Sequence, residues 1–229
     1  MDFAFLGETL LRLLSAVPTT LELALVSVSI GLGLALLLAL LRASSIIGAG
    51  FVRAYVFVFR GSPLLVQIFL IYYGLGQFDI IRESVLWPFL RRPWWCAILA
   101  LALNTAAYGS EIIRGGLAAV PAGSVEAGRV AGMSRFTLYR RIILPLALRQ
   151  ALPAYGSEVI IMVKSTSLAS IITITELTGT ARQIVSDSFR AIEVFVCAGL
   201  IYLAINFLLT RVVVLLERSL SPHLRSVPR

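Results

Sequence analysis

Five long apolar stretches follow one another along this chain, and they restrict its fold more than any other feature. They cover approximately residues 18–41, 52–76, 94–114, 146–166 and 192–216. The hydrocarbon core of a bilayer takes roughly 20 apolar residues per helix, so each stretch is long enough to cross it. Backbone polar groups in lipid need partners within their own segment, which favours helices. The sequence therefore predicts an all-α, polytopic membrane protein with five transmembrane helices.

The composition excludes an ordinary soluble domain. Hydrophobic residues make up 59% of the 229 residues and charged residues only 14%, which is too much apolar surface for a soluble core of this size. Two of the five stretches are interrupted, the second by RGSP at residues 60–63 and the fourth by Pro153 and Gly156. In the second, Gly61 can end a helix and Pro63 can begin one. Arg60 is then either an anchor at the cytoplasmic boundary or part of a hinge.

We expect residues 1–229 to form a single transmembrane domain. The first 17 residues are acidic and the first apolar run is too long for a cleaved signal, which predicts a short extramembrane start. Cys96 and Cys197 lie inside apolar stretches, and His223, the single histidine, is far from both in the sequence. This pattern encodes neither a disulfide framework nor a metal site, so both cysteines are predicted to pack in the core. We expect no cofactor bound by this chain.

The distribution of basic residues predicts the orientation. Thirteen Lys and Arg residues and two acids lie in three segments expected on one side, namely 42–60, 114–149 and 211–229. Seven Lys and Arg residues and seven acids lie in the segments expected on the other side, namely 1–17, 77–93 and 164–193. The positive-inside rule places the first set in the cytoplasm, with the N-terminus outside and the C-terminus inside. Topology and anionic lipid explain the net charge of +8, so we expect no nucleic-acid partner.

The predicted cytoplasmic segment 115–145 contains a polar, glycine-punctuated sequence, EAGRVAGMSRFTLYRRIILP, at residues 126–145. Its small residues would let another surface approach the backbone closely: Ala127, Gly128, Ala131 and Gly132. Glu126 and Arg129 are three residues apart and can pair on one helix face. Pro145 is expected to stop the helix or direct it into the next span. By residue chemistry alone, an amphipathic surface helix and a docking surface for a cytosolic partner are both possible.

The spacing in this segment resembles the EAA loop of ABC importer permeases, which is E-A-A, three residues, G, nine residues and I-x-L-P. The matching positions are Glu126, Ala127, Gly132, Ile142, Leu144 and Pro145, with Gly128 in place of the second alanine. Three further stretches are similar to polar amino-acid uptake permeases: FRGSPLLVQIFLIYYGL, NTAAYGSEIIRGGL and EVIIMVKSTSLAS. Within that family the chain looks most like M-type subunits of the histidine/lysine/arginine/ornithine and octopine/nopaline systems.

The resemblance implies a type I ABC importer permease fold in the bacterial inner membrane, with a cytoplasmic coupling helix. The implied partners are a cytosolic ABC ATPase dimer that binds ATP, a second permease subunit of the Q type, and a periplasmic or extracellular solute-binding protein. The implied cargo is a polar or basic amino acid or an opine-type derivative. The chain has no G-x-x-x-x-G-K-[ST] phosphate loop, so it needs an ATPase partner or an ion gradient and is not itself an enzyme.

Ionisable residues inside the apolar stretches are costly and usually functional. Glu158 lies deep in the fourth stretch, between PAYGS and VIIMV, and broken helices near the midplane are where transporters bind substrates. The resemblance implies a substrate site made of Asn104, Glu158 and Lys164. A structural Glu158–Lys164 ion pair is the alternative. At the inner end of the third stretch, Glu111 and Arg114 are predicted to form an ion pair.

Two other classes of protein remain possible. A secondary amino-acid carrier driven by an ion gradient usually has more spans and inverted repeats, which are not visible here. A polytopic membrane enzyme would need a nucleophile, metal ligands or an acid–base pair at one depth, and the chain offers no clustered Cys or His. The ABC permease is therefore the preferred interpretation.

Overall fold

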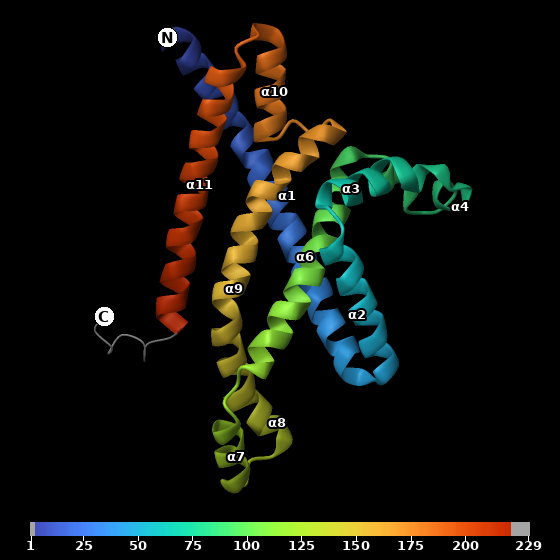
Figure 1. The fold of residues 1–229 in the computed structure, drawn as a ribbon, viewed down its shortest axis with the longest axis vertical. Helices are drawn as coiled ribbons and strands as arrows, with labels where there is room; N and C mark the ends of the chain where they lie inside the picture. Colours follow the sequence, from blue (N-terminus) through green and yellow to red (C-terminus); the bar gives the residue numbers. More distant parts are fainter. Residues whose placement is uncertain (1–2, 221–229) are drawn as a thin grey trace.

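The computed structural model describes residues 3–220, and every regular element within this range is helical (Figure 1). Three helices are long and apolar enough to cross a membrane: α1 (Phe3–Ser44), α6 (Pro93–Ala118) and α11 (Ala191–Leu220). Two bent helix pairs pass the same test of length and composition, which raises the number to five if each pair is one span. The all-α prediction with five candidate spans is confirmed, whereas His223 lies outside the described residues.

The first apolar stretch belongs to a longer helix than the sequence predicted. α1 begins at Phe3, so the described part of the expected extramembrane start is helical and continuous with the first span. Pro18 lies inside α1 without ending it. A proline within a spanning helix is tolerated where neighbouring helices compensate for the lost backbone hydrogen bond.

The second stretch is broken rather than straight. α2 (Ile46–Gly61) and the helical segment that follows it, which begins with α3 (Leu64–Phe69), meet at 104°. Gly61 is the last residue of α2 and Pro63 directly precedes α3, as predicted. Proline fixes its own φ and restricts the residue before it, so a helix cannot continue through this point. The chain then passes through a π-helical turn (Leu70–Gly74), α4 (Asp79–Arg82) and α5 (Trp87–Leu90) before α6.

The break predicted in the fourth stretch lies elsewhere. α9 (Leu144–Ser165) runs through Pro153 and Gly156, so the prediction that this part of the helix is loosened is wrong. The chain bends later, after a 3₁₀ segment (Thr166–Ile172), at Thr173, where φ is 72°. α10 (Leu177–Ser188) follows at 46° to the preceding helical segment.

α6 is the central helix of the molecule. In an 18-residue apolar stretch of α6, 67% of the residues are buried, whereas the corresponding fraction is 28% in α1 and in α11. α1 and α6 cross in Figure 1, and small residues allow the close contact. A Cβ atom on Gly31 would lie 2.7 Å from the side chain of Thr105, and one on Gly109 would lie 2.9 Å from the Cβ of Ala35. Such small-residue interfaces are typical of helix packing in membranes, where lipid supplies no hydrophobic driving force.

Two clusters of buried apolar residues form the core, and each contains one cysteine. Cys96 packs with Leu23 and Ile68 around α6, and Cys197 packs with Leu13 and other residues near α10 and α11. Both cysteines are buried and free. The prediction that they are packing residues is confirmed.

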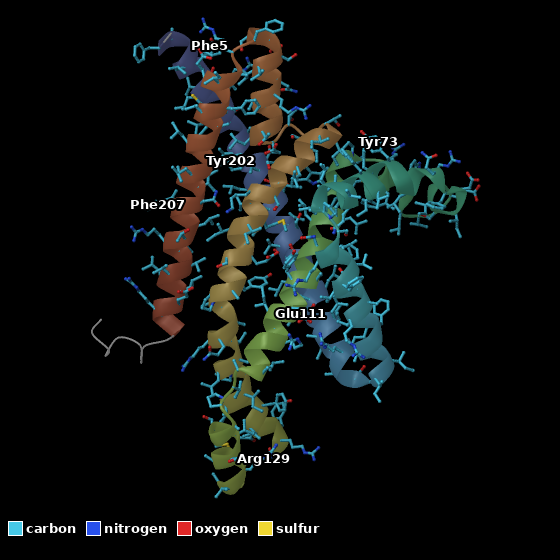
Figure 2. All side chains as sticks on the ribbon, viewed as in Figure 1. Phe5, Tyr73, Glu111, Arg129, Tyr202 and Phe207 are labelled. Carbon is cyan, nitrogen blue, oxygen red and sulfur yellow. The ribbon has the colours of Figure 1, made fainter. Side chains whose placement is uncertain are left out.

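Buried polar contacts around Glu176 hold α10 against two other helices. Glu176, which is fully buried, accepts hydrogen bonds from the backbone N–H of Gly179 at 2.8 Å and from the hydroxyl of Tyr202 on α11 at 2.8 Å. The backbone N–H of Leu177 donates to the Thr20 hydroxyl of α1 at 3.0 Å. Tyr202 lies between α11 and the helices behind it (Figure 2). The chain break before α10 is therefore fully supported by polar contacts in an apolar environment.

Candidate functional site

A helical hairpin projects from one end of the bundle (Figure 1). It consists of α7 (Ala122–Val130), α8 (Arg135–Leu138) and a π-helical turn (Tyr139–Ile143) that leads into α9. Glu126, Ala127 and Gly132 are exposed on it. We call it the α7–α8 hairpin and the end of the bundle that carries it the hairpin end. It contains most of the motif that resembles the EAA loop.

Gly128, the position that departs from the EAA pattern, faces inward. A Cβ atom there would lie 2.5 Å from the Cδ1 of Leu138 and 2.8 Å from the Cδ1 of Ile142. Its small size therefore lets α7 pack onto its own hairpin. The sequence had suggested that Gly128 would let a partner approach closely, but its small size is used for this internal contact. Leu138 is buried at this contact, whereas Leu144 is exposed at the start of α9.

Gly132 ends α7 in a left-handed conformation with φ 73°. Its N–H donates to the carbonyl of Arg129 at 3.0 Å, and the N–H of Met133 donates to the carbonyl of Gly128 at 3.1 Å. This is the Schellman motif, which favours glycine because other residues are strained at positive φ. The predicted ion pair between Glu126 and Arg129 is not formed between these two described side chains.

Pro145 does not stop the helix. It occupies the second position of α9, directly after the π-helical turn, and the chain is helical from Arg135 to Ile172. Proline has no N–H to continue the hydrogen-bond ladder, and the π-helical turn directly before α9, in which the Leu144 N–H donates to the carbonyl of Tyr139, shifts the bonding pattern at this point. The hairpin is thus joined to the fourth span by one continuous helical segment.

Asn104 lies in the interior, at the break between α2 and α3. Its amide nitrogen donates to the carbonyl of Phe59 at 3.3 Å and to Oε1 of Gln67 at 3.0 Å. The amide nitrogen of Gln67 donates in turn to the carbonyls of Phe59 and Ser62, at 2.8 and 3.1 Å. These bonds satisfy carbonyls that the break leaves without helical partners, as buried backbone groups require. The sequence identified Asn104 but not this supporting role or that of Gln67.

Arg60 is an exposed charged residue near the end of α2, beside the α2–α3 break. It lies about 21 Å along α2 from Ile46, at the break, which is where the hinge was expected, and its role as an anchor stays a prediction. Its guanidinium carbon stacks over the ring of Tyr108 at 4.9 Å from the centroid. It is also the cation that acts electrostatically on Glu158. The only signal in the sequence was an arginine within an apolar stretch.

Glu158 is buried on α9, with 6% of its surface exposed, and Lys164 is exposed. The six-residue spacing places Lys164 roughly 240° further around the helix. The alternative of a structural Glu158–Lys164 ion pair is therefore wrong for these two described residues. The structure brings Asn104, Arg60 and Glu158 to the region of the α2–α3 break, and it turns Lys164 toward the surface of the chain.

A second charged group lies where α1 and α6 approach the hairpin end, near the label of Glu111 in Figure 2. Glu111 and Arg114 form the predicted ion pair, with 2.7 Å between Oε2 and Nη2. Arg42 of α1 joins it from the other side, with 2.5 Å between its Nη1 and Oε1 of Glu111. The prediction of the Glu111–Arg114 pair is confirmed, and the participation of Arg42 is new.

A bundle of apolar helices with charged groups inside and a helical hairpin outside has the architecture of a membrane transport subunit. Residues 10–222 match the family described as binding-protein-dependent transport system inner membrane component. The chain belongs to this family. Its predicted class, a permease subunit with a type I ABC importer fold and no enzymatic activity of its own, is confirmed.

Individual relatives and a solved structure agree with the family. The chain is 55% identical over 229 residues to the octopine transport system permease protein OccM of Rhizobium meliloti, covering 100% of this chain and 94% of that protein. It is 41% identical over 212 residues to the arginine ABC transporter permease protein ArtM of Haemophilus influenzae, covering 92% and 93%. A crystal structure of an amino acid ABC transporter with histidines superposes with a TM-score of 0.85 at 35% identity, covering 96% of this chain and 99% of that one.

Proposed function

We propose that this chain forms part of the translocation pathway of an ABC importer for polar or basic amino acids or opine-type derivatives. The observation that carries the proposal is the continuous helical segment from Arg135 to Ile172, which joins the α7–α8 hairpin to the buried Glu158. Energy comes from ATP bound by a partner ATPase dimer, which docks on the hairpin. The names of the similar octopine and arginine permeases support this class of cargo.

The hairpin couples the ATPase to the pathway by moving as a rigid body together with α9. Gly128 packs on Leu138 and Ile142, so α7 cannot move independently of the start of α9. A displacement of α7 by the ATPase is therefore passed along α9 to Glu158 and to the bend at Thr173. Rigid-body movement of packed helices is an established way for proteins to switch between states.

The region around the α2–α3 break binds the cargo. Glu158 supplies a carboxylate for a cationic group of the substrate, and Arg60 supplies a guanidinium for its carboxylate. Asn104 holds the broken backbone beside Arg60 in place through the Phe59 carbonyl and Gln67. Lys164 faces outward from this chain, toward the subunit that completes the pathway.

The second permease subunit is a related Q-type chain, and a solute-binding protein delivers the cargo from outside. We place the hairpin end in the cytoplasm, with the N-terminus outside and the C-terminus inside, because the basic residues are concentrated on the hairpin side. The charge bias supports this orientation in the bacterial inner membrane. Lipid covers the apolar side chains that remain exposed on α1 and α11.

Reconstitution tests the proposal directly. The chain is assembled in lipid vesicles with its partner permease and ATPase, and ATP hydrolysis is measured with a liganded binding protein across a panel of amino acids and opines. We expect hydrolysis to be stimulated by the cognate cargo and uptake to require ATP. Uptake driven by an ion gradient without the ATPase would contradict the proposal.

A further inference from the structure

A cavity of about 240 Å³ lies between α1, α2 and α6 toward the hairpin end, and the transport cycle proposed above does not use it. Its lining combines two arginines with small and apolar residues: Ala39, Arg42, Ala43, Val52, Ser110, Arg114 and Leu117. Both arginines are held by the Glu111 carboxylate, which lies beside the cavity. The cavity therefore combines cationic groups from α1 and α6 with a mainly apolar lining.

Glu111 fixes the positions of the two guanidinium groups but accepts hydrogen bonds from only some of their N–H donors. Arg42 uses only Nη1 for Glu111 Oε1, and Arg114 uses Nε and Nη2 for Oε2, at 2.8 and 2.7 Å. Each guanidinium has five N–H donors, so both keep donors free for a further acceptor. Two cations against one carboxylate leave one net positive charge. Planar guanidinium donors held in fixed positions suit the oxygens of a phosphate group.

The depth of the cavity matches the headgroup region of a membrane. Arg42 lies two residues before the end of α1 and Arg114 four residues before the end of α6, and both of these helices are membrane spans. Large apolar side chains on the nearby helix surfaces remain exposed: Leu36, Leu40 and Phe51. A phosphate bound between the arginines would therefore lie next to an apolar helix surface that acyl chains can cover.

We propose that this cavity is a binding site for the phosphodiester of an anionic phospholipid in the leaflet at the hairpin end. The phosphate accepts hydrogen bonds from Arg42 and Arg114, the glycerol unit occupies the space beside Ala39 and Ala43, and the acyl chains lie along α1 and α2. Basic pockets between spanning helices commonly hold anionic headgroups, because charge and apolar burial act together. The bound lipid would join α1 to α6 at the end from which the hairpin begins.

The test is lipid retention by the complete transporter, purified with its partner subunits in mild detergent. Native mass spectrometry counts bound phosphatidylglycerol and phosphatidylcholine after each is supplied separately. We expect selective retention of phosphatidylglycerol, and a fall in its affinity of roughly 10-fold or more in the double variant Arg42→Gln/Arg114→Gln. The control is Arg53→Gln, which removes an exposed arginine of α2 that lies outside the cavity and bonds only to the carbonyl of Ala49.

A second variant protects the test against misfolding of the first. Ala43→Phe fills the cavity from its exposed rim and leaves both arginines in place, so it should lose the lipid with Glu111 still paired. Displacement of phosphatidylglycerol by millimolar inorganic phosphate alone would identify a free-anion site and contradict the lipid assignment. Equal retention by the wild type, the double variant and Ala43→Phe would also overturn it.

Discussion

At the scale of single residues, the interior charges of this protein need a reason to be there. A charged side chain in the middle of a membrane span costs about 2.5 to 3.5 kcal/mol on insertion scales, unless it meets water or a partner. Glu158 is buried, has no ion pair among the described residues, and lies within electrostatic reach of Arg60 at the α2–α3 break. Such a cost without structural compensation favours a role in binding cargo.

Glu158→Gln should therefore reduce transport of cationic substrates about tenfold more than transport of neutral ones, since glutamine keeps the size and removes the charge. Arg60→Gln should reduce both classes, because every amino-acid substrate carries a carboxylate. Uptake is measured per unit of inserted protein with one cationic and one neutral substrate. The control is Glu22→Gln, which removes an exposed acid from α1. If Glu158→Gln reduced uptake of both substrates equally, Glu158 would have a structural role and would not bind the cationic group of the cargo.

Glu176 illustrates the opposite case, a buried acid whose partners explain it. Glu176→Ala removes the acceptor of Gly179 N–H and of the Tyr202 hydroxyl, leaving buried donors unpaired at about 1 to 3 kcal/mol each. We expect a lower melting temperature in detergent and less protein in the membrane. Uptake should therefore fall equally for all substrates. Glu83→Ala, at an exposed acid between α4 and α5, serves as the comparison. An unchanged melting temperature for Glu176→Ala would contradict the structural role of this network.

At the scale of elements, the α7–α8 hairpin derives its shape from two glycines with different functions. Gly128 allows a close contact within the hairpin, and Gly132 supplies the left-handed residue that ends α7. The exposed positions Glu126 and Ala127 are then free for a partner. The hairpin resembles a preformed docking element, because its own contacts and not those of a partner fix its conformation.

Gly132→Asp should insert normally and abolish transport. Aspartate tolerates the left-handed conformation better than most residues, and its Cβ would meet no atom of this chain within 4 Å. The hairpin therefore keeps its fold while its exposed surface gains a charge where the ATPase is proposed to dock. Membrane protein level and uptake are measured together, with Gly132→Asn as the uncharged control that should lose less. Normal uptake by Gly132→Asp would remove the docking assignment.

At the scale of the whole molecule, the fold places the hairpin at one end of the bundle and the α10 segment at the other (Figure 1). α1 runs from the α10 end to the hairpin end and α11 begins again beside α10, so one side of the membrane receives the hairpin and the turn between α1 and α2. The hairpin is rich in arginine, and Arg42 lies at the turn. Charge and architecture agree on which segments share a side.

Reporter fusions test this arrangement. Fusions after Leu75 and after Ser186 should report the outside, and a fusion after Ser134 the inside, because 13 Lys and Arg residues lie on the predicted cytoplasmic segments against 7 on the others. A fusion after Arg225, which lies outside the described residues, should also report the inside. Paired reporters that are active on opposite sides give the readout. A cytoplasmic signal at Ser186 would be incompatible with five spans in this orientation.

The sequence by itself determined the class of fold and the motif. Apolar length forces helices in lipid, so 18–41, 94–114 and 192–216 were recognised as spans without any tertiary information. Local chemistry was sufficient at Gly61 and Pro63, because backbone sterics act between neighbours in the chain. The Glu111–Arg114 pair followed for the same reason, since three-residue spacing on a helix brings side chains together.

The tertiary structure alone decided which charges meet and where helices bend. Arg42 pairs with Glu111, which is 69 positions away in the sequence. Arg60 lies in the region of Glu158 because α2 ends at the break after Gly61. Pro153 does not break α9, whereas the chain bends at Thr173. There Glu176 accepts hydrogen bonds from the first N–H groups of α10, and the Tyr202 hydroxyl of α11 donates to the same carboxylate. Such outcomes depend on packing between helices distant in sequence, and periodicity and spacing along one helix carry no information about the helix that will lie against it.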